Sequence, residues 1–201
     1  MKIILATSNK DKVREVKEFL ENERNIKILT SKDFNIDKFE VNEDGQSLKE
    51  NSYKKAKALF DIVKTPTLAD DTGLFVKSLD NKPGVHSHRY ANENPSYKEN
   101  RDKLLDELRE KKDRSAYFKT VICFIDSKGE DYYFEGKVDG EICKEEIGDK
   151  DFGYDQIFKV KGENKTFGQM SEKEKNSFSH RTLALDEFRK FLGKINENSN
   201  N

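Results

Sequence analysis

Two adjacent carboxylates, Asp70 and Asp71, follow a short apolar segment and precede a Thr-Gly pair. Neighbouring carboxylates repel one another unless a cation neutralises them. Protein-bound Mg²⁺ is usually held by one or two carboxylates together with the phosphates of a substrate. The segment is therefore a candidate cation site, although Asp, Thr and Gly are also typical of an ordinary turn. Three further acidic residues lie upstream and extend this set: Glu43, Asp44 and Glu50.

The polar segment from Thr7 to Lys12 is suited to binding phosphates. It follows an apolar run at residues 2–6 and precedes apolar residues that recur with a helical period. A helix N-terminus presents unpaired backbone N–H groups and a partial positive charge to an anion. Ser8 followed by Asp11 resembles a capping box, and no glycine-rich Walker loop is present. The alternative is an ordinary helix cap with solvated lysines.

Two motifs in the C-terminal half carry aromatic and cationic groups. Phe152 to Asp155 places two aromatic rings around a glycine, which can sandwich a flat base, or can form a core aromatic at a tight turn. Lys175 can meet a phosphate. His180 and Arg181 can donate hydrogen bonds to the edge of a purine, although most charged runs are solvated helix faces.

The elements that must position these residues alternate between strand and helix in the first half of the chain. Periodicity predicts strands at residues 2–6, 26–29, 67–69, 121–125 and 132–138, and helices that begin near residues 10, 48, 97 and 172. The last of these helices is expected to extend to Leu192. The pattern predicts a mixed-sheet α/β fold. Such folds bind ligands in loops at strand ends, so the loops after Ala6 and Ala69 are expected to carry the chemistry.

Length and composition limit the protein classes to which the chain can belong. Its 201 residues fit one domain, or one domain with two lobes. The 38 basic and 39 acidic residues nearly cancel, and 14 Phe and 7 Tyr favour a folded protein over a disordered one. The balance of charge disfavours a nucleic-acid partner. Cys123 and Cys143 lack metal-type spacing and fit a reducing cytoplasm, and the opening apolar run is too short for a signal peptide or membrane span.

Five motifs follow one another in order along the chain. They are Thr7-Ser8-Asn9-Lys10-Asp11-Lys12, Asp70-Asp71-Thr72-Gly73-Leu74, Pro83-Gly84-Val85 with Ser87 and Arg89-Tyr90, Phe152-Gly153-Tyr154-Asp155, and Ser179-His180-Arg181. Together they resemble the inosine/xanthosine triphosphate pyrophosphatase family. The resemblance covers residues 1 to about 190, which is nearly the whole chain.

The resemblance implies a fold and an activity. The fold is α/β and ITPase-like: an elongated, two-lobed mixed β-sheet flanked by helices, with a central active-site cleft. We expect a single domain over residues 1–195 and a disordered tail over residues 196–201. The implied activity is the Mg²⁺-dependent hydrolysis of ITP, dITP and XTP to the monophosphate and pyrophosphate, which prevents their incorporation into nucleic acids. The implied enzyme is a cytoplasmic homodimer with no membrane partner.

The resemblance also implies a role for each matching residue. Asp71 is the proton acceptor and, with Glu43, a metal ligand. The phosphates are bound by Thr7, Ser8, Asn9, Lys10, Asp11 and Lys12. The remaining contacts to substrate are made by Thr72, Phe152, Gly153, Tyr154, Asp155, Lys175, His180 and Arg181. Within this set, His180 and Arg181 are expected to donate to the oxygen at the six position of hypoxanthine or xanthine, where adenine carries an amino group.

The chain departs from the usual family pattern at a few positions. Thr72 stands where Ser is common and keeps the hydroxyl, and Gln156 stands where Pro is common. Lys150 and Asp151 precede Phe152 where glycines are common. The changes at 150, 151 and 156 alter the expected stiffness of the base-binding loop.

Three other functions compete with this interpretation. A related pyrophosphatase for pyrimidine or modified nucleotides is disfavoured by the segment Ser179 to Arg181, which fits a purine edge. A non-catalytic nucleotide sensor has no need for Asp71 and Glu43 together. An RNA-binding protein is disfavoured by the near-zero net charge.

Overall fold

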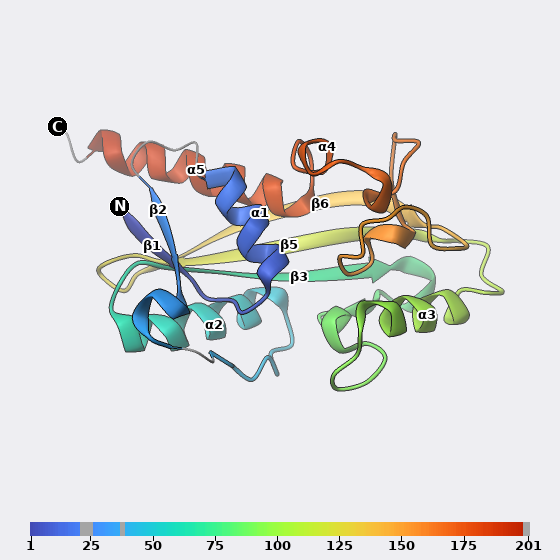
Figure 1. Ribbon diagram of the computed structural model, residues 1–201, viewed down its shortest axis with the longest axis horizontal. Coiled ribbons are helices and arrows are strands. Elements are labelled where there is room, and N and C mark those ends of the chain that lie inside the picture. The colour runs from blue at the N-terminus through green and yellow to red at the C-terminus, as the bar shows by residue number, and fades with distance from the viewer. Residues whose placement is uncertain (21–25, 37–38, 199–201) are drawn as a thin grey trace. The chain divides into compact units, whose positions relative to one another are not determined.

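The structure, a computed structural model, describes residues 1–20, 26–36 and 39–198 of the chain. Figure 1 shows its elements. The strands are β1 Lys2–Leu5, β2 Lys27–Thr30, β3 Thr67–Val76, β4 Lys82–Gly84, β5 Ser115–Ile125, β6 Asp131–Ile142 and β7 Phe158–Val160. The α-helices are α1 Lys10–Leu20, α2 Leu48–Val63, α3 Tyr97–Glu107, α4 Glu172–Lys175 and α5 His180–Asn198.

The strands of the described residues form one seven-stranded mixed sheet in the order β2-β1-β3-β5-β6-β7, with β4 paired to β3. Strand β1 pairs in parallel with both β2 and β3, whereas β4 and β7 are antiparallel to β3 and β6. Parallel neighbours require a crossover connection, and α1 provides one between β1 and β2. The predicted fold class, a mixed sheet flanked by helices, is confirmed; the elongated shape and the central cleft stay predictions.

The chain divides into two compact units. Unit 1 contains Met1–Asp71, Thr120–Gly136 and Arg181–Asn201, and unit 2 contains Thr72–Lys119 and Lys137–His180. One boundary falls between Asp71 and Thr72 and another between His180 and Arg181, so each of these two lies inside a sequence motif. The organisation as a single domain stays a prediction.

In unit 1, helices cover both faces of the sheet. Successive side chains of a strand point to opposite faces. Accordingly, Ile3 and Leu5 pack in one cluster with α1 and α5, while Ile4 and Ala6 pack in a second cluster with α2. Burial on both faces explains why the opening segment of the sequence is an unbroken apolar run.

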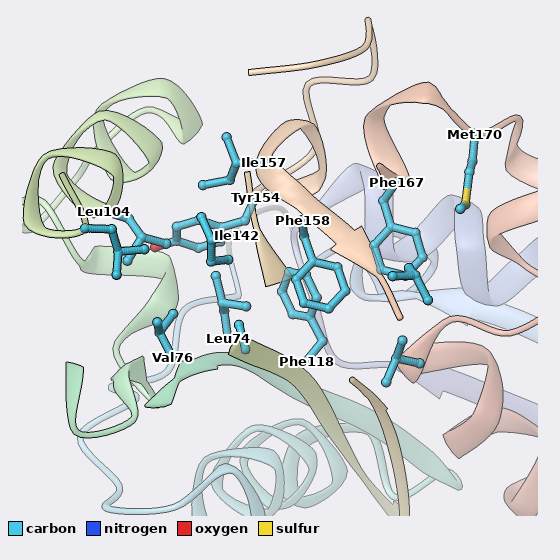
Figure 2. Close-up of a cluster of buried hydrophobic side chains, with 14 residues drawn as sticks. Leu74, Val76, Leu104, Phe118, Ile142, Tyr154, Ile157, Phe158, Phe167 and Met170 are labelled. Carbon is cyan, nitrogen blue, oxygen red and sulfur yellow. The ribbon is translucent and has the colours of Figure 1, made fainter. Parts of the chain in front are cut away.

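Unit 2 has a hydrophobic core of its own, shown in Figure 2. Leu74 of β3 and Phe118 of β5 contribute to it from the sheet, and Leu104 contributes from α3. The ring of Phe118 meets that of Phe158 edge-on, with 4.6 Å between centroids. Tyr154, from one of the sequence motifs, also belongs to this core. The core therefore anchors the segments that carry the aromatic motif.

The expectation of a loop after Ala69 is wrong. Strand β3 runs without interruption from Thr67 to Val76, so Asp70 to Gly73 lie within a strand. The turn alternative rested on Asp, Thr and Gly, which are typical turn residues, whereas the structure places two carboxylates in a buried strand. They are tolerated here because cations from distant parts of the chain neutralise them, as described below.

The single helix expected over residues 172–192 is two helices, α4 and α5. Between them, Phe178 packs against the core of unit 2, whereas Phe188 of α5 belongs to a core of unit 1. At the other end, α5 continues to Asn198, into the segment expected to be a disordered tail, and residues 199–201 lie outside the described residues. No helix among the described residues is long and apolar enough to cross a membrane.

Candidate active site

Side chains of α1, α2 and α5, together with Glu43, gather around Asp70 and Asp71, the part of strand β3 that belongs to unit 1. We call this group the ionic cluster. Its members, most of them buried, are Lys12, Glu15, Glu43, Asn51, Lys55, Asp70, Asp71 and Arg181. Because Asp70 and Asp71 are successive residues of a strand, their side chains point to opposite faces and meet different partners.

Asp71 and Glu43 converge on one ammonium group. Lys55 Nζ donates to Asp71 Oδ1 at 2.9 Å and to Glu43 Oε2 at 2.9 Å. Asn51, one helical turn before Lys55, donates through Nδ2 to Asp71 Oδ2 at 3.2 Å. Helix α2 thus supplies both groups that hold the Asp71 carboxylate in place.

Burial and charge separate the basicities of these carboxylates. Burial raises the pKa of Asp71, and the negative charge of Glu43 adds to this effect, against the opposing charges of Lys55 and Lys12. Burial also disfavours the charged form of Glu43, but the charge and hydrogen bond of Lys55 and the charge of Lys12 act together against it, and the pKa of Glu43 is lowered. Asp71 is therefore the stronger proton acceptor of the two, as a general base requires.

Asp70 is held by a different set of cations. Its Oδ2 lies 3.1 Å from Lys12 Nζ and 3.1 Å from Arg181 Nε. Arg181 also donates through Nη1 to Glu15, so its guanidinium joins α5 to both α1 and β3. Although burial alone raises the pKa of Asp70, the charges of Lys12 and Arg181 outweigh it and hold that pKa below its ordinary value. Asp70 acts as an anchor within unit 1, and the base-reading role of Arg181 stays a prediction.

The loop after β1 is the N-terminus of α1, as expected, but its capping residue differs from the expectation. Asn9 Oδ1 accepts from the backbone N–H groups of Asp11 and Lys12, at 2.9 and 3.2 Å. The Ser8–Asp11 capping box is therefore wrong: the helix begins at Lys10, which places Asn9 rather than Ser8 at the cap. Ser8 and Lys10 are left exposed at this helix end.

The Glu43–Lys55–Asp71 group fits a divalent cation by the chemistry of its donors. Two carboxylates converge on one position, which is taken by an ammonium group in this structure. Within the described ranges, no three His, Cys, Asp or Glu side chains gather into a metal cage. Mg²⁺ is commonly bound by only one or two carboxylates while phosphates and waters complete its shell, so the donor set suits it.

In unit 2, an ion pair lies beside the aromatic motif. Lys175 Nζ is 2.6 Å from Asp155 Oδ2, and both side chains are nearly buried. The same ammonium lies over the rings of Phe152 and Phe167, 4.8 and 5.5 Å from their centroids. The Phe152 ring is half-buried and meets Tyr97 of α3 edge-on at 5.7 Å. The structure thus brings together Phe152, Asp155 and Lys175, three of the residues expected to bind substrate.

The other expected residues of unit 2 are placed around this group or in its core. The His180 ring stacks on Phe118, with 4.6 Å between centroids and 15° between planes. Tyr154 is buried and donates its hydroxyl to the backbone oxygen of Ser87 at 2.8 Å, which suits a structural residue more than a ligand. Thr72 is half-buried and directly follows Asp71.

Sequence reasoning missed three members of the ionic cluster: Asn51, Lys55 and Glu15. A signal for the first two was present. Asn51 and Lys55 are four residues apart on α2 and share its buried face with Leu48 and Leu59. A polar pair at helical spacing within an apolar face indicates a buried partner of opposite charge.

Comparisons with known proteins bear on the chain as a whole. A model of the Ham1 family matches residues 3–191. The chain is 43% identical over 187 residues to a dITP/XTP pyrophosphatase of Desulfotalea psychrophila, covering 93% of this chain and 83% of that protein. It is 39% identical over 194 residues to a dITP/XTP pyrophosphatase of Christiangramia forsetii, covering 96% and 100%. The solved structure of the Staphylococcus aureus Ham1 protein is similar with a TM-score of 0.86 and 34% identity, covering 97% of this chain and all of that one (100%).

Proposed function

The chain belongs to the Ham1 family, and we propose on that premise that it hydrolyses ITP, dITP and XTP to the monophosphate and pyrophosphate. Two relatives that are dITP/XTP pyrophosphatases support the substrate class. The observation in this chain that carries the proposal is the convergence of Asp71 and Glu43 on Lys55, which combines a proton acceptor with a cation-binding pair.

In unit 1, we assign three residues of the ionic cluster, Lys12, Glu43 and Asp71, to the triphosphate. Asp71 accepts the proton of the water that attacks the α-phosphorus, and the bond to pyrophosphate breaks. General-base catalysis of this kind contributes a factor of about 10²–10⁴ in rate. Lys12 and the N-terminus of α1 bind phosphate oxygens and offset the charge that moves onto the leaving group.

Glu43 and Asp71 are the residues that would hold Mg²⁺. When bound there, the ion supplies positive charge to the phosphate oxygens and orients them. Lys55 keeps the two carboxylates together and offsets their mutual repulsion.

We assign the base to residues of unit 2. The half-buried ring of Phe152 offers a face for stacking, and Asp155 offers a hydrogen-bond acceptor. A donor from His180 complements the six-position oxygen of hypoxanthine and xanthine and opposes the amino group of adenine. A polar site that the wrong base leaves unpaired can discriminate by as much as about 10⁴.

One assay tests the proposed function. The protein is incubated with ITP, XTP, ATP and GTP, with and without Mg²⁺, and the products are identified by ion-exchange chromatography. We expect pyrophosphate and monophosphate from ITP and XTP, much slower turnover of ATP, and loss of activity when Mg²⁺ is chelated. Release of orthophosphate, or equal turnover of all four nucleotides, would contradict the proposal.

Replacing Lys55 tests the proposed metal pair without an activity readout. In Lys55→Met, the ammonium no longer neutralises Glu43 and Asp71, so Mg²⁺ is expected to bind the nucleotide-free protein more tightly. An opposite charge at this range shifts a carboxylate equilibrium by 1–3 pKa units, so we expect a gain of about tenfold or more. Isothermal titration with MgCl₂ measures it.

The neighbouring residue supplies a matched control. Lys54 pairs with Asp44 and Glu50 at the exposed surface of the same helix. Lys54→Met removes the same charge one residue away and is expected to leave Mg²⁺ affinity nearly unchanged. Unchanged or weaker Mg²⁺ binding in Lys55→Met would rule out Glu43 and Asp71 as the metal pair.

The family resemblance further supports a homodimer that works in the cytoplasm, and we include both in the proposal. Analytical ultracentrifugation of the purified chain measures the first.

A further inference from the structure

A buried arginine of unit 2 lies outside the five sequence motifs. Arg101 is on α3, and only 2% of its side chain is exposed. Its three guanidinium nitrogens donate to three acceptors in one loop. Nε donates to Glu146 Oε1 at 2.6 Å, Nη1 to the backbone oxygen of Gly153 at 2.8 Å, and Nη2 to Asp151 Oδ1 at 2.6 Å. We call this arrangement the Arg101 clamp.

The clamp holds the residues on both sides of Phe152. Asp151 precedes Phe152 and Gly153 follows it, and each accepts from Arg101. From the same helix, one turn before Arg101, Tyr97 packs edge-on against the Phe152 ring. Helix α3 thus holds the side chain of Asp151 and the backbone of Gly153, and it also contacts the ring of Phe152.

The local sequence explains why the loop needs such a partner. Gly153 has a φ of +57°, a left-handed conformation that a glycine adopts without strain. Asp151 is largely exposed, at 69% of its side chain, and does not hold the loop by burial. A planar guanidinium, by contrast, presents several donors in a fixed geometry, so that one side chain restrains several acceptors together.

We infer that Arg101 is a positioning residue for Phe152 and that, through Asp151 and Gly153, it determines how selectively the base is bound. The inference rests on the proposed function, in which Phe152 stacks on the base. Arg101 acts through this loop, because its side chain is buried and its three nitrogens donate to the loop. When the Phe152 ring is held in one position, the base stacked on it keeps its polar edge aligned with the hydrogen-bond donors of the site. When the ring is mobile, the base can adopt several orientations.

The test uses two variants that weaken the clamp by different routes. Asp151→Ala removes one exposed acceptor and preserves the buried arginine. Arg101→Lys keeps the positive charge but replaces the planar guanidinium by one ammonium group. This group does not donate to all three acceptors together. The loss of one hydrogen bond to a charged group changes an equilibrium constant by a factor of about 10 to 100. We therefore expect the KM for ITP to rise about tenfold, with kcat nearly unchanged and a lower ratio of kcat/KM for ITP over ATP.

A matched control is available on the same helix. Asp102 is exposed and pairs with Lys98 within α3, so Asp102→Ala removes a comparable ion pair away from the loop. The control is expected to keep the wild-type KM and selectivity. Thermal unfolding of all variants separates these effects from a general loss of stability, which does not raise KM selectively.

Hydrogen exchange of the backbone amides of residues 150–154 supplies a readout that is independent of activity. We expect faster exchange in Asp151→Ala and Arg101→Lys than in wild type or Asp102→Ala. Unchanged exchange and an unchanged KM in both clamp variants would overturn the inference. If wild type hydrolyses none of the triphosphates, the proposed function fails, and the base-selectivity part of the inference fails with it. If wild type is active and selective but the clamp variants match it, only the inference fails.

Discussion

Asp71→Asn is expected to reduce turnover by a factor of at least about 10²–10⁴ while the protein stays folded. The substituted amide cannot accept a proton at neutral pH and no longer carries the negative charge proposed to bind Mg²⁺. It is nearly the same size as the carboxylate, and its oxygen still accepts from Lys55, which lies 2.9 Å from Asp71 Oδ1. Steady-state kinetics with ITP, together with thermal unfolding, measure both parts of the prediction.

The control for this variant is an acidic residue with similar partners at the surface. Asp61 on α2 is exposed and pairs with Lys57 and Lys64. Asp61→Asn is expected to turn over ITP at nearly the wild-type rate. Near-normal turnover in Asp71→Asn would refute the assignment of Asp71 as the proton acceptor, whatever the behaviour of the control.

Among the substitutions proposed for this chain, Arg181→Met is expected to lower the free energy of unfolding most, by about 3–5 kcal/mol. The guanidinium is 2% exposed and pairs with Asp70 and Glu15, two carboxylates that are themselves buried. Removing it leaves Glu15 without this cation and leaves Asp70 dependent on Lys12. Urea unfolding monitored by circular dichroism measures the difference.

An exposed arginine on the same helix provides the comparison. Arg189 pairs with Asp186 at the surface, and Arg189→Met is expected to change stability by no more than about 0.5 kcal/mol. If Arg181→Met lowered the free energy of unfolding by as little as Arg189→Met is expected to, the ionic cluster would contribute little to the stability of the fold.

The loss of folding stability in Arg181→Met is expected to depend on pH in a definite direction. In the folded wild type, the charges of Lys12 and Arg181 hold the pKa of Asp70 below its unfolded value of about 3.9. A depressed folded pKa contributes stability that is present above the unfolded pKa and lost as the pH falls toward the folded one. The deficit of the variant is therefore expected to be largest above about pH 4 and to shrink at lower pH.

The local features of the fold are readable from the residue order because they depend on near neighbours. The apolar run at residues 2–6 predicts a strand buried on both faces, and the structure places one there. Ser47 predicts the start of α2, and its side chain accepts from the amide of Glu50. The ordered motifs were enough to indicate the family, since each is a short segment whose residues are adjacent in sequence.

The partners of the charged residues were not predictable in the same way. Asp70 and Asp71 read as one acidic pair in the sequence, yet the strand directs them to opposite faces. Asp70 meets Arg181, 111 residues away, whereas Asp71 meets Lys55 of α2. Likewise, the residues adjacent to Phe152 in the sequence do not indicate that Arg101, about 50 residues earlier, donates hydrogen bonds to Asp151 and Gly153. A periodic pattern predicts that a side chain is buried, but the group that it contacts depends on long-range packing.

The acidic segment therefore has two separate roles that its residue order alone does not distinguish. The residue types and their spacing indicated a candidate phosphate site and a candidate cation site, with an ordinary helix cap and an ordinary turn as the alternatives. Tertiary contacts then favour Asp70 as the anchor and Asp71 as the proposed proton acceptor, because the charges of Lys12 and Arg181 hold the pKa of Asp70 low whereas burial raises the pKa of Asp71.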